Sequence, residues 1–411
     1  MKMKPEKTIL VLSICMALQI TSFVIILPLF ARRFSELGAG LEALGISAMA
    51  YALTSTLAAP FMGSLADRFG RRRLVLVSLI VYVVAFSGYL LARSAEAIIV
   101  IRGLAGAFTA GLIPAVIGIT ADLAPKEHRA QWIGIVNGGA SVGWIAGPIL
   151  GGVMYDRWGY NAALVVSIVI AQATFLIAYF MVPETGKNSA NLSTIKREPF
   201  QLGDLKSSWR SFLNTLPNPV STFALLLWIS FTVMFAWTFI EPRFMFYAYD
   251  DLGWNSSMLG MAMSTYGIAM ALGEFGLSQL SDRLGRKPVI LFGLILFSAQ
   301  YIGLAFFQNY LLIVASFVVA GLGNALFDPA LSAAILDITP VKHQARALGL
   351  KSTAGSLGNI LGPALVVLFS TSVNASGIFI IASGVVLLTM LVTLPAAETG
   401  LQPTKNATGS N

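Results

Sequence analysis

The sequence predicts an all-α membrane protein whose twelve transmembrane helices form two pseudo-symmetric six-helix bundles. Three observations predict this fold class. Hydrophobic residues make up 56 % of the chain and charged residues only 11 %, less than half the charged share of a typical soluble domain. Long stretches contain no charged residue, and one pattern of polar, Gly and Pro residues occurs twice. Most of the protein surface is therefore expected to face lipid.

The charge-free stretches have the length of membrane-spanning helices. A helix needs about 20 mostly apolar residues to cross the hydrocarbon layer, whereas strands of a membrane barrel alternate over about 10 residues. The runs here are continuous and longer, which favours helices. The first run is too long for a cleaved signal peptide and is expected to be retained. The expected spans are residues 8–31, 43–66, 74–92, 97–121, 130–154, 161–182, 220–248, 257–280, 288–307, 309–337, 346–369 and 376–395.

The net charge is +8, and the distribution of the positive residues along the chain indicates membrane topology. Most of the 27 Lys and Arg residues fall on one side if both termini are cytoplasmic, and four, Arg32, Arg33, Arg93 and Arg157, fall outside. This asymmetry follows the positive-inside rule. It predicts a multi-pass protein of the plasma (inner) membrane with both termini in the cytoplasm. The lipid bilayer, and no nucleic acid, is the expected partner of the basic residues.

The two halves of the chain align at a shift of 215 residues. Repeats of this kind with an even number of spans keep the same orientation and hold the substrate near the midplane between them. We therefore expect an N-terminal six-helix bundle at 1–186, a cytoplasmic linker at 187–219 with a short helix near 205–213, and a C-terminal bundle at 220–411 with an unstructured tail from 402. The shift superposes Asp67, Arg68, Gly70 and Arg71 on Asp282, Arg283, Gly285 and Arg286, Asp122 on Asp337, and Gly143, Gly147 and Pro148 on Gly358, Gly362 and Pro363.

The strongest local motif is the loop from Gly63 to Arg73, which recurs from Ser278 to Lys287. Glycine at Gly70 and Gly285 permits a tight turn with positive φ. This loop resembles the signature of the major facilitator superfamily, and the glycine motif from Gly143 to Gly152 in the fifth span resembles that of its twelve-helix drug/proton antiporter branch. The resemblance implies a cytoplasmic gate of charged residues. They would be Asp67, Arg68, Arg71 and Asp122 in the first half and Asp282, Arg283, Arg286 and Asp337 in the second. The alternative is a solvated turn whose charges only set topology.

Two further segments resemble motifs of that superfamily. Arg102 and Gly106 match its fourth-helix arginine motif, which implies a role in protonation. Charge inside the membrane is costly, and the alternative is that Arg102 extends to the outer interface. The fifth span carries Gly143, Gly147, Pro148, Gly151 and Gly152, repeated in part at Gly358, Gly362 and Pro363. That pattern resembles the antiporter motif and favours export, while small residues at this spacing also pack helices closely.

Ionisable residues within the spans are the candidates for proton coupling or substrate binding. They are Glu241, Arg243, Glu274, Asp328 and Lys351, together with Arg102. Burial disfavours the charged form of a carboxyl group, so such a group could take up and release a proton. The alternative is structural pairing, of Glu241 with Arg243 or of Asp328 with Lys351. The first span has no acidic residue, only Gln19, so a proton site is expected mainly in the second half.

The sequence therefore predicts a secondary active transporter that works by alternating access. Proton-coupled efflux of small lipophilic or cationic compounds is the expected function. The alternative is an uptake carrier of the same fold for sugars, organic acids or other small metabolites. We expect no enzyme activity and no metal or organic cofactor, since no nucleotide loop, metal cluster or catalytic triad is visible. The proton is the expected coupling ion, and the transporter is expected to be a monomer. The single cysteine, Cys15, allows no internal disulfide.

Overall fold

The computed structural model describes most of the chain but little of the segment between its halves. The expected linker helix and the tail from 402 lie outside the described residues, and so do the side chains of Asp67 and Ala130. The structure describes residues 4–125, 128–185, 217, 219–277, 280–369 and 372–393.

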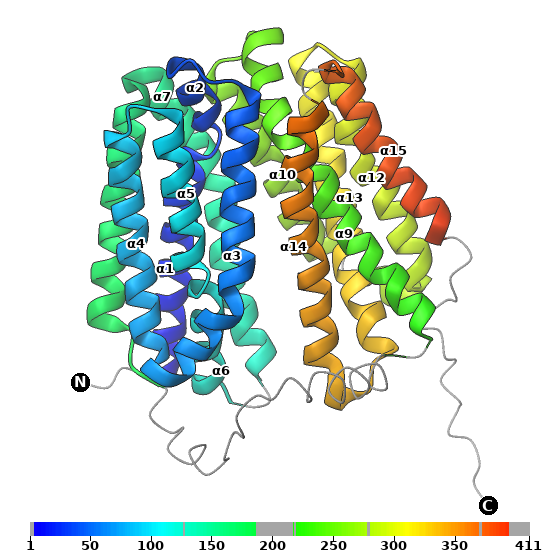
Figure 1. The fold of residues 1–411 in the computed structure, drawn as a ribbon. Coiled ribbons are helices and arrows are strands. Elements are labelled where there is room, and N and C mark those ends of the chain that lie inside the picture. The colour runs from blue at the N-terminus through cyan, green and yellow to red at the C-terminus, as the bar shows by residue number, and fades with distance from the viewer. Residues whose placement is uncertain are drawn as a thin grey trace, which may run out of the picture. The chain divides into compact units, whose positions relative to one another are not determined.

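Helices make up nearly all of the described part of the first half (Figure 1). The first span is interrupted after Ile26 and continues as a second helix, and the fourth span is interrupted in the same way near Gly111. The helices are α1 (Pro5–Ile26), α2 (Leu29–Glu36), α3 (Leu41–Phe69), α4 (Arg71–Leu91), α5 (Ala95–Thr109), α6 (Leu112–Leu123) and α7 (Arg129–Met181).

The second half repeats this arrangement. Its first span ends in a short π-helix, η3, and its second span is followed by the short helix α11. The elements are α9 (Val220–Phe246), η3 (Tyr247–Asp251), α10 (Ser256–Leu277), α11 (Leu280–Leu284), α12 (Arg286–Phe306), α13 (Tyr310–Asp337), η4 (Val341–His343), α14 (Gln344–Phe369) and α15 (Ala375–Thr393).

The described helices are consistent with the predicted number of spans. Ten stretches of the described residues are long and apolar enough to cross a membrane. One of these, 131–181, contains two helices, because Gly159 in α7 has non-helical angles (φ 79°, ψ −180°). Helix α10, of 22 residues, supplies the remaining span. The predicted all-α, twelve-helix membrane fold is therefore confirmed, and the predicted division into 1–186, 187–219 and 220–411 stays a prediction.

Local sequence explains where these helices begin and end. Gly70 (φ 99°) and Gly285 (φ 93°) lie between consecutive helices with positive φ, so the expected turn is present in both copies of the loop. Side-chain caps start other helices: Ser94 accepts a hydrogen bond from Ala97 N at the start of α5, and Asn309 accepts one from Leu311 N at the start of α13. Such caps satisfy backbone donors that the helix itself leaves unpaired.

Contacts group the chain into two compact units, which we describe separately. Unit 1 comprises Met1–Glu198, Trp237–Gly267 and Asn359–Ile378. Unit 2 comprises Pro199–Ala236, Ile268–Gly358 and Phe379–Asn411. In unit 1, α1 packs along α7 and α3 packs along α5; in unit 2, α12 packs along α13 (Figure 1).

The closest packing in unit 1 follows a glycine stripe on α7. A Cβ atom added at Gly143 would lie 2.8 Å from the backbone oxygen of Ala17, and one added at Gly151 would lie 2.2 Å from that of Ile25. Gly147 meets the same helix, α1, at Val24. The predicted packing role of these glycines is therefore present, because only glycine lets the two backbones approach this far.

The corresponding glycine of the second half makes the equivalent contact in unit 2. A Cβ atom at Gly358 of α14 would lie 2.5 Å from the backbone oxygen of Phe231 and 2.7 Å from the nitrogen of Phe235, both on α9. Spans five and eleven thus use equivalent glycines to pack against spans one and seven. The internal repeat of the sequence is a repeat of helix packing as well.

Candidate substrate and gating sites

Arg102 is buried in unit 1 among aromatic rings. Its side chain is only 6 % exposed, and its guanidinium lies 4.6 Å from the ring centre of Phe30 and 5.5 Å from that of Tyr51. Within the described residues its Nε has no hydrogen-bond partner. Cation–π contacts of this kind hold a desolvated guanidinium. Arg102 is therefore enclosed by the bundle and retains an unused donor.

An aromatic cluster extends from Arg102 through the first half. Phe30 meets Tyr89 edge to face at 5.2 Å between ring centres, and Phe23 lies 5.7 Å from Tyr51 and 6.0 Å from Tyr82. This cluster was not singled out from the sequence. The signal was present in the helical spacing of Tyr82, Phe86 and Tyr89, which places three rings on one face of α4.

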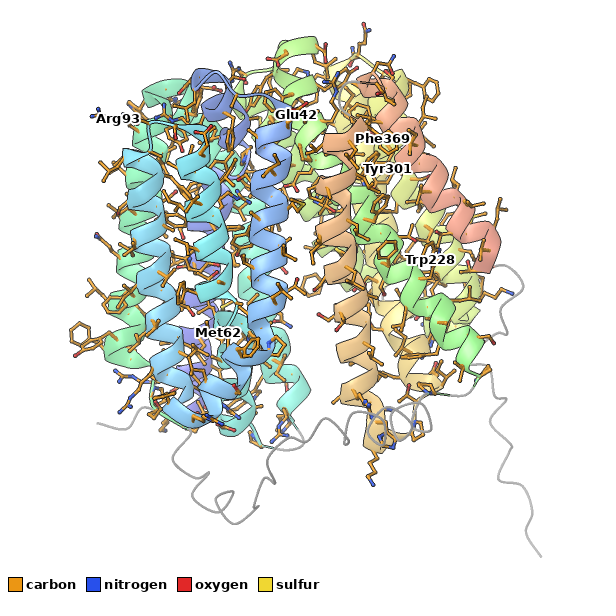
Figure 2. All side chains as sticks on the ribbon, in the orientation of Figure 1. Glu42, Met62, Arg93, Trp228, Tyr301 and Phe369 are labelled. Atoms are coloured by element: carbon orange, nitrogen blue, oxygen red, sulfur yellow. The ribbon has the colours of Figure 1, made fainter. Side chains whose placement is uncertain are left out.

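The aromatics of span seven mostly build the helix core. Phe239 and Phe244 are fully buried. In unit 2, Trp228 stacks on Phe231 at 5.2 Å, and Phe231 stacks on Phe235 at 5.8 Å. Figure 2 labels Trp228 on α9, where its side chain is 48 % exposed. These contacts are packing, and they do not single out a cavity.

Glu241 lies on α9 in unit 1, partly buried. The positive charge of Arg102 acts on its carboxylate, although the two side chains form no ion pair within 4.0 Å. Among the described residues, Glu241 makes no hydrogen bond. The alternative pairing of Glu241 with Arg243 is absent, because Arg243 instead points to Asp251, with 4.0 Å between Nη2 and Oδ2. Glu241 thus keeps an unpaired carboxylate near a buried cation.

The other three coupling candidates lie together in unit 2. Lys351 Nζ lies 2.6 Å from Asp328 Oδ1 and 2.7 Å from Ser332 Oγ. This is the structural pair that the sequence left open. Glu274 on α10 is exposed, and the negative charge of Asp328 acts on its carboxylate. This pair links α13 to α14, and it occupies both Lys351 and one oxygen of Asp328.

The first charged loop forms an ion pair across two helices of unit 1. Arg71, the first residue of α4, has its Nη1 2.6 Å from Asp122 Oδ2 and donates to the Gly118 carbonyl, also at 2.6 Å. Arg68 is exposed. The side chain of Asp67 lies outside the described part of the structure. The loop therefore ties the start of α4 to the end of α6.

The second charged loop forms a fuller network in unit 2. Arg286 donates through Nε to Asp337 Oδ2 at 3.0 Å and through Nη1 to Ser281 Oγ at 2.9 Å, and the same Nη1 contacts Asp282. One arginine thus contacts both carboxylates that the family resemblance implied as its partners. Arg283 is exposed, like its counterpart Arg68.

Arg72 makes a contact that sequence reasoning did not anticipate. Its Nε donates to the Val182 carbonyl at 2.7 Å, and its guanidinium lies 5.6 Å from the ring centre of Tyr179. Cations near a helix C-terminus pair with the carbonyls that the helix leaves free. The basic run of the loop therefore contributes a specific anchor between α4 and the end of α7, in addition to its topological charge.

No metal site is present among the residues that the structure describes: no three His, Cys, Asp or Glu side chains are grouped to hold an ion. Some charged groups instead form ion pairs at helix ends, as Arg71 and Arg286 do, and others, such as Arg102, lie buried within spans. Together with two packed glycine repeats, this arrangement defines a helical membrane transporter built from tandem repeats. The Major Facilitator Superfamily profile matches residues 9–249 and again 226–410, and the chain belongs to that superfamily.

Comparison with known proteins supports the same assignment. The chain is 27 % identical over 342 residues to the multi-drug resistance efflux pump PmrA homolog of Lactococcus lactis, covering 82 % of this chain and 81 % of that protein. It is 28 % identical over 368 residues to the class B tetracycline resistance protein of Escherichia coli, covering 87 % and 86 %.

A solved structure shows the same fold. The inward-facing, unoccupied bacterial homolog of the human lysosomal transporter Spinster superposes with a TM-score of 0.73 at 16 % identity, over 96 % of this chain and 94 % of that one. As a member of the Major Facilitator Superfamily, the chain is a multi-pass membrane transporter of small molecules and not an enzyme.

Proposed function

We propose that the chain is a proton-coupled exporter of small lipophilic or cationic compounds that works by alternating access. The observation that carries the proposal is the unpaired carboxylate of Glu241, partly buried on α9 with the charge of Arg102 acting on it. The names of the relatives, a multi-drug efflux pump and a tetracycline resistance protein, are in keeping with export.

The chemistry follows from the two forms of this carboxyl group. When it is protonated, Glu241 is neutral and suits the apolar interior of the membrane. When it is ionised, it attracts a cation, and the aromatic rings around Arg102 can contact an apolar scaffold. A proton and a cationic substrate thus compete for one group, which couples their movements in opposite directions. Ionising Glu241 at this partly buried position is costly, and the positive charge of Arg102 offsets part of that cost.

Purified protein in vesicles tests the coupling. A fluorescent quaternary ammonium compound serves as the substrate, because its fixed charge prevents it from carrying a proton itself. With the vesicle interior made acidic, protons leave through the protein and the compound accumulates inside. Protein-free vesicles provide the background. Accumulation that ignores the pH gradient would refute antiport, and accumulation only when the outside is acidic would favour the uptake carrier.

The variant Glu241→Gln tests the residue. Glutamine keeps the size of the side chain but cannot ionise, so gradient-driven accumulation should fall more than tenfold while some substrate binding remains. Glu96→Gln is the matched control, since Glu96 is an exposed carboxylate in the first turn of α5 and its loss should change little. Wild-type accumulation in Glu241→Gln would remove Glu241 from the mechanism.

A further inference from the structure

One aspartate, Asp156, joins the two halves of the sequence within unit 1. It lies on α7 next to the break at Gly159, and its carboxylate accepts hydrogen bonds from the first two backbone N–H groups of α10. The distances are 3.0 Å from Ser256 N to Oδ1 and 2.7 Å from Ser257 N to Oδ2. Hydrogen bonds to a carboxylate are stronger than those between neutral groups.

Two side chains accept hydrogen bonds from the backbone N–H groups at the start of α10. A helix leaves its first N–H groups without intrahelical partners. Asn255 Oδ1 accepts from Met258 N at 2.8 Å, so α10 carries a cap of its own, and Asp156 satisfies the two preceding donors. The hydrogen bonds of Asp156 can therefore break without unwinding α10, because the cap formed by Asn255 stays in place. Since Asp156 is exposed, water can replace it at the two freed N–H groups.

Arg32 makes a second connection to the same segment. It lies on α2, donates through Nη2 to the Trp254 carbonyl at 3.2 Å, and has its guanidinium 4.2 Å from the ring centre of Tyr249. Tyr249 in turn donates its hydroxyl hydrogen to the Pro28 carbonyl at 3.1 Å. Asp156 of α7, Arg32 of α2 and the carbonyl of Pro28, just before α2, thus form hydrogen bonds to residues within 249–257.

Glycines bring the backbones close enough for these bonds. A Cβ atom at Gly152 of α7 would lie 2.2 Å from the Ser256 carbonyl oxygen, and one at Gly260 of α10 would lie 2.1 Å from the Pro148 carbonyl oxygen. The glycines allow the contact, but they provide no directional bond that holds it. Directional bonds come from Ser264 Oγ of α10, which donates to the Ile145 carbonyl of α7 at 2.7 Å, and from the polar groups at the end of the interface.

We propose that Asp156 and Arg32 form an outer latch, which holds α10 and η3 against α7 and α2 and releases once in each transport cycle. The inference rests on the proposed alternating access. The predicted topology places Arg32 and Arg157, the neighbour of Asp156, on the outer side of the membrane together with Arg93. Figure 2 shows Arg93 at the same end of the unit 1 helices as Glu42. Opening the outer side has to separate these elements, and the latch ties their ends together.

Distances between two spin labels test the latch. Cys15→Ser removes the only cysteine, and cysteines then introduced at Arg93 and Asp250 carry the labels. Both side chains are exposed and neither is one of the two latch residues; Asp250 lies on η3, which the latch holds, and Arg93 lies between α4 and α5. Asp156→Asn retains the shape but loses the charge and one acceptor, and Arg32→Gln breaks the second connection. Each variant should raise the ratio of the long-distance to the short-distance population about tenfold. Arg157→Gln, an exposed charge next to Asp156, should leave it unchanged.

The measurement needs neither a substrate nor a pH gradient, so it is independent of the coupling experiment. An unchanged population ratio in Asp156→Asn, or in Arg32→Gln should the first variant not fold, would overturn the latch. An equal shift in Arg157→Gln would overturn it too, because the effect would then follow from surface charge. If accumulation does not depend on the pH gradient but the latch variants change the distance populations as expected, the proposed function is rejected and the latch is supported.

Discussion

The contact between α1 and α7 predicts a large effect from a single methyl group. Gly151→Ala places a Cβ atom 2.2 Å from the Ile25 carbonyl oxygen, where ordinary van der Waals contact needs 3.4 Å or more. The obstacle is backbone, which cannot rotate away as a side chain can. The two helices must separate, and the contacts along the glycine stripe weaken with them.

The magnitude follows from comparison with a glycine on the same helix. At Gly138 an added Cβ atom would meet nothing within 4 Å, so Gly138→Ala should stabilise the protein by about 0.5–1 kcal/mol through lower backbone entropy in the unfolded chain. The same gain applies to Gly151→Ala, but overpacking there costs about 1–3 kcal/mol. The free energies of unfolding of the two variants should therefore differ by about 1–3 kcal/mol.

Unfolding of both variants in the same detergent, followed by tryptophan fluorescence against denaturant, measures this difference. Packing decides helix association in a membrane, because lipid removes the hydrophobic drive between helices. The expected order of stability is Gly138→Ala above wild type and Gly151→Ala below it. Equal stability of the two alanine variants would show that α1 and α7 do not approach as closely as the structure has them.

The charged groups lead to two further predictions. Arg71→Gln removes the ion pair with Asp122 and the bond to the Gly118 carbonyl, so turnover should fall several-fold while membrane insertion, measured by the amount of folded protein, stays normal; unchanged turnover would return the loop to a topological role. Lys351→Met leaves Asp328 without its cation and should lower the free energy of unfolding by about 1 kcal/mol, since the half-exposed carboxylate is screened by water. Adding Asp328→Asn should restore most of that loss, and a larger loss in the double variant would contradict the pairing.

The fold was predictable because its causes are local along the chain. Span lengths follow from the thickness of the membrane, and the turns at Gly70 and Gly285 follow from backbone freedom. The interruption after Ile26 was not predicted, because apolar composition runs on through it, whereas the break at Gly159 falls between the predicted spans 130–154 and 161–182. The expected partners of Arg71 and Arg286 were implied by the family resemblance, and the repeat carried the same expectation into the second half.

The sequence by itself determined the membrane location of the chain, its helical spans and the doubling of its charged loops and glycines, because hydrophobicity, net charge and residue spacing act over short distances. Only the tertiary structure decided which charges pair. In the structure Arg243 pairs with Asp251 and Lys351 pairs with Asp328. Glu241 has no hydrogen bond among the described residues, and Asp156 accepts hydrogen bonds at the start of α10. The physical reason is that an ion pair or a helix cap depends on the position and direction of a few atoms, and these are set only when helices distant in the sequence pack together.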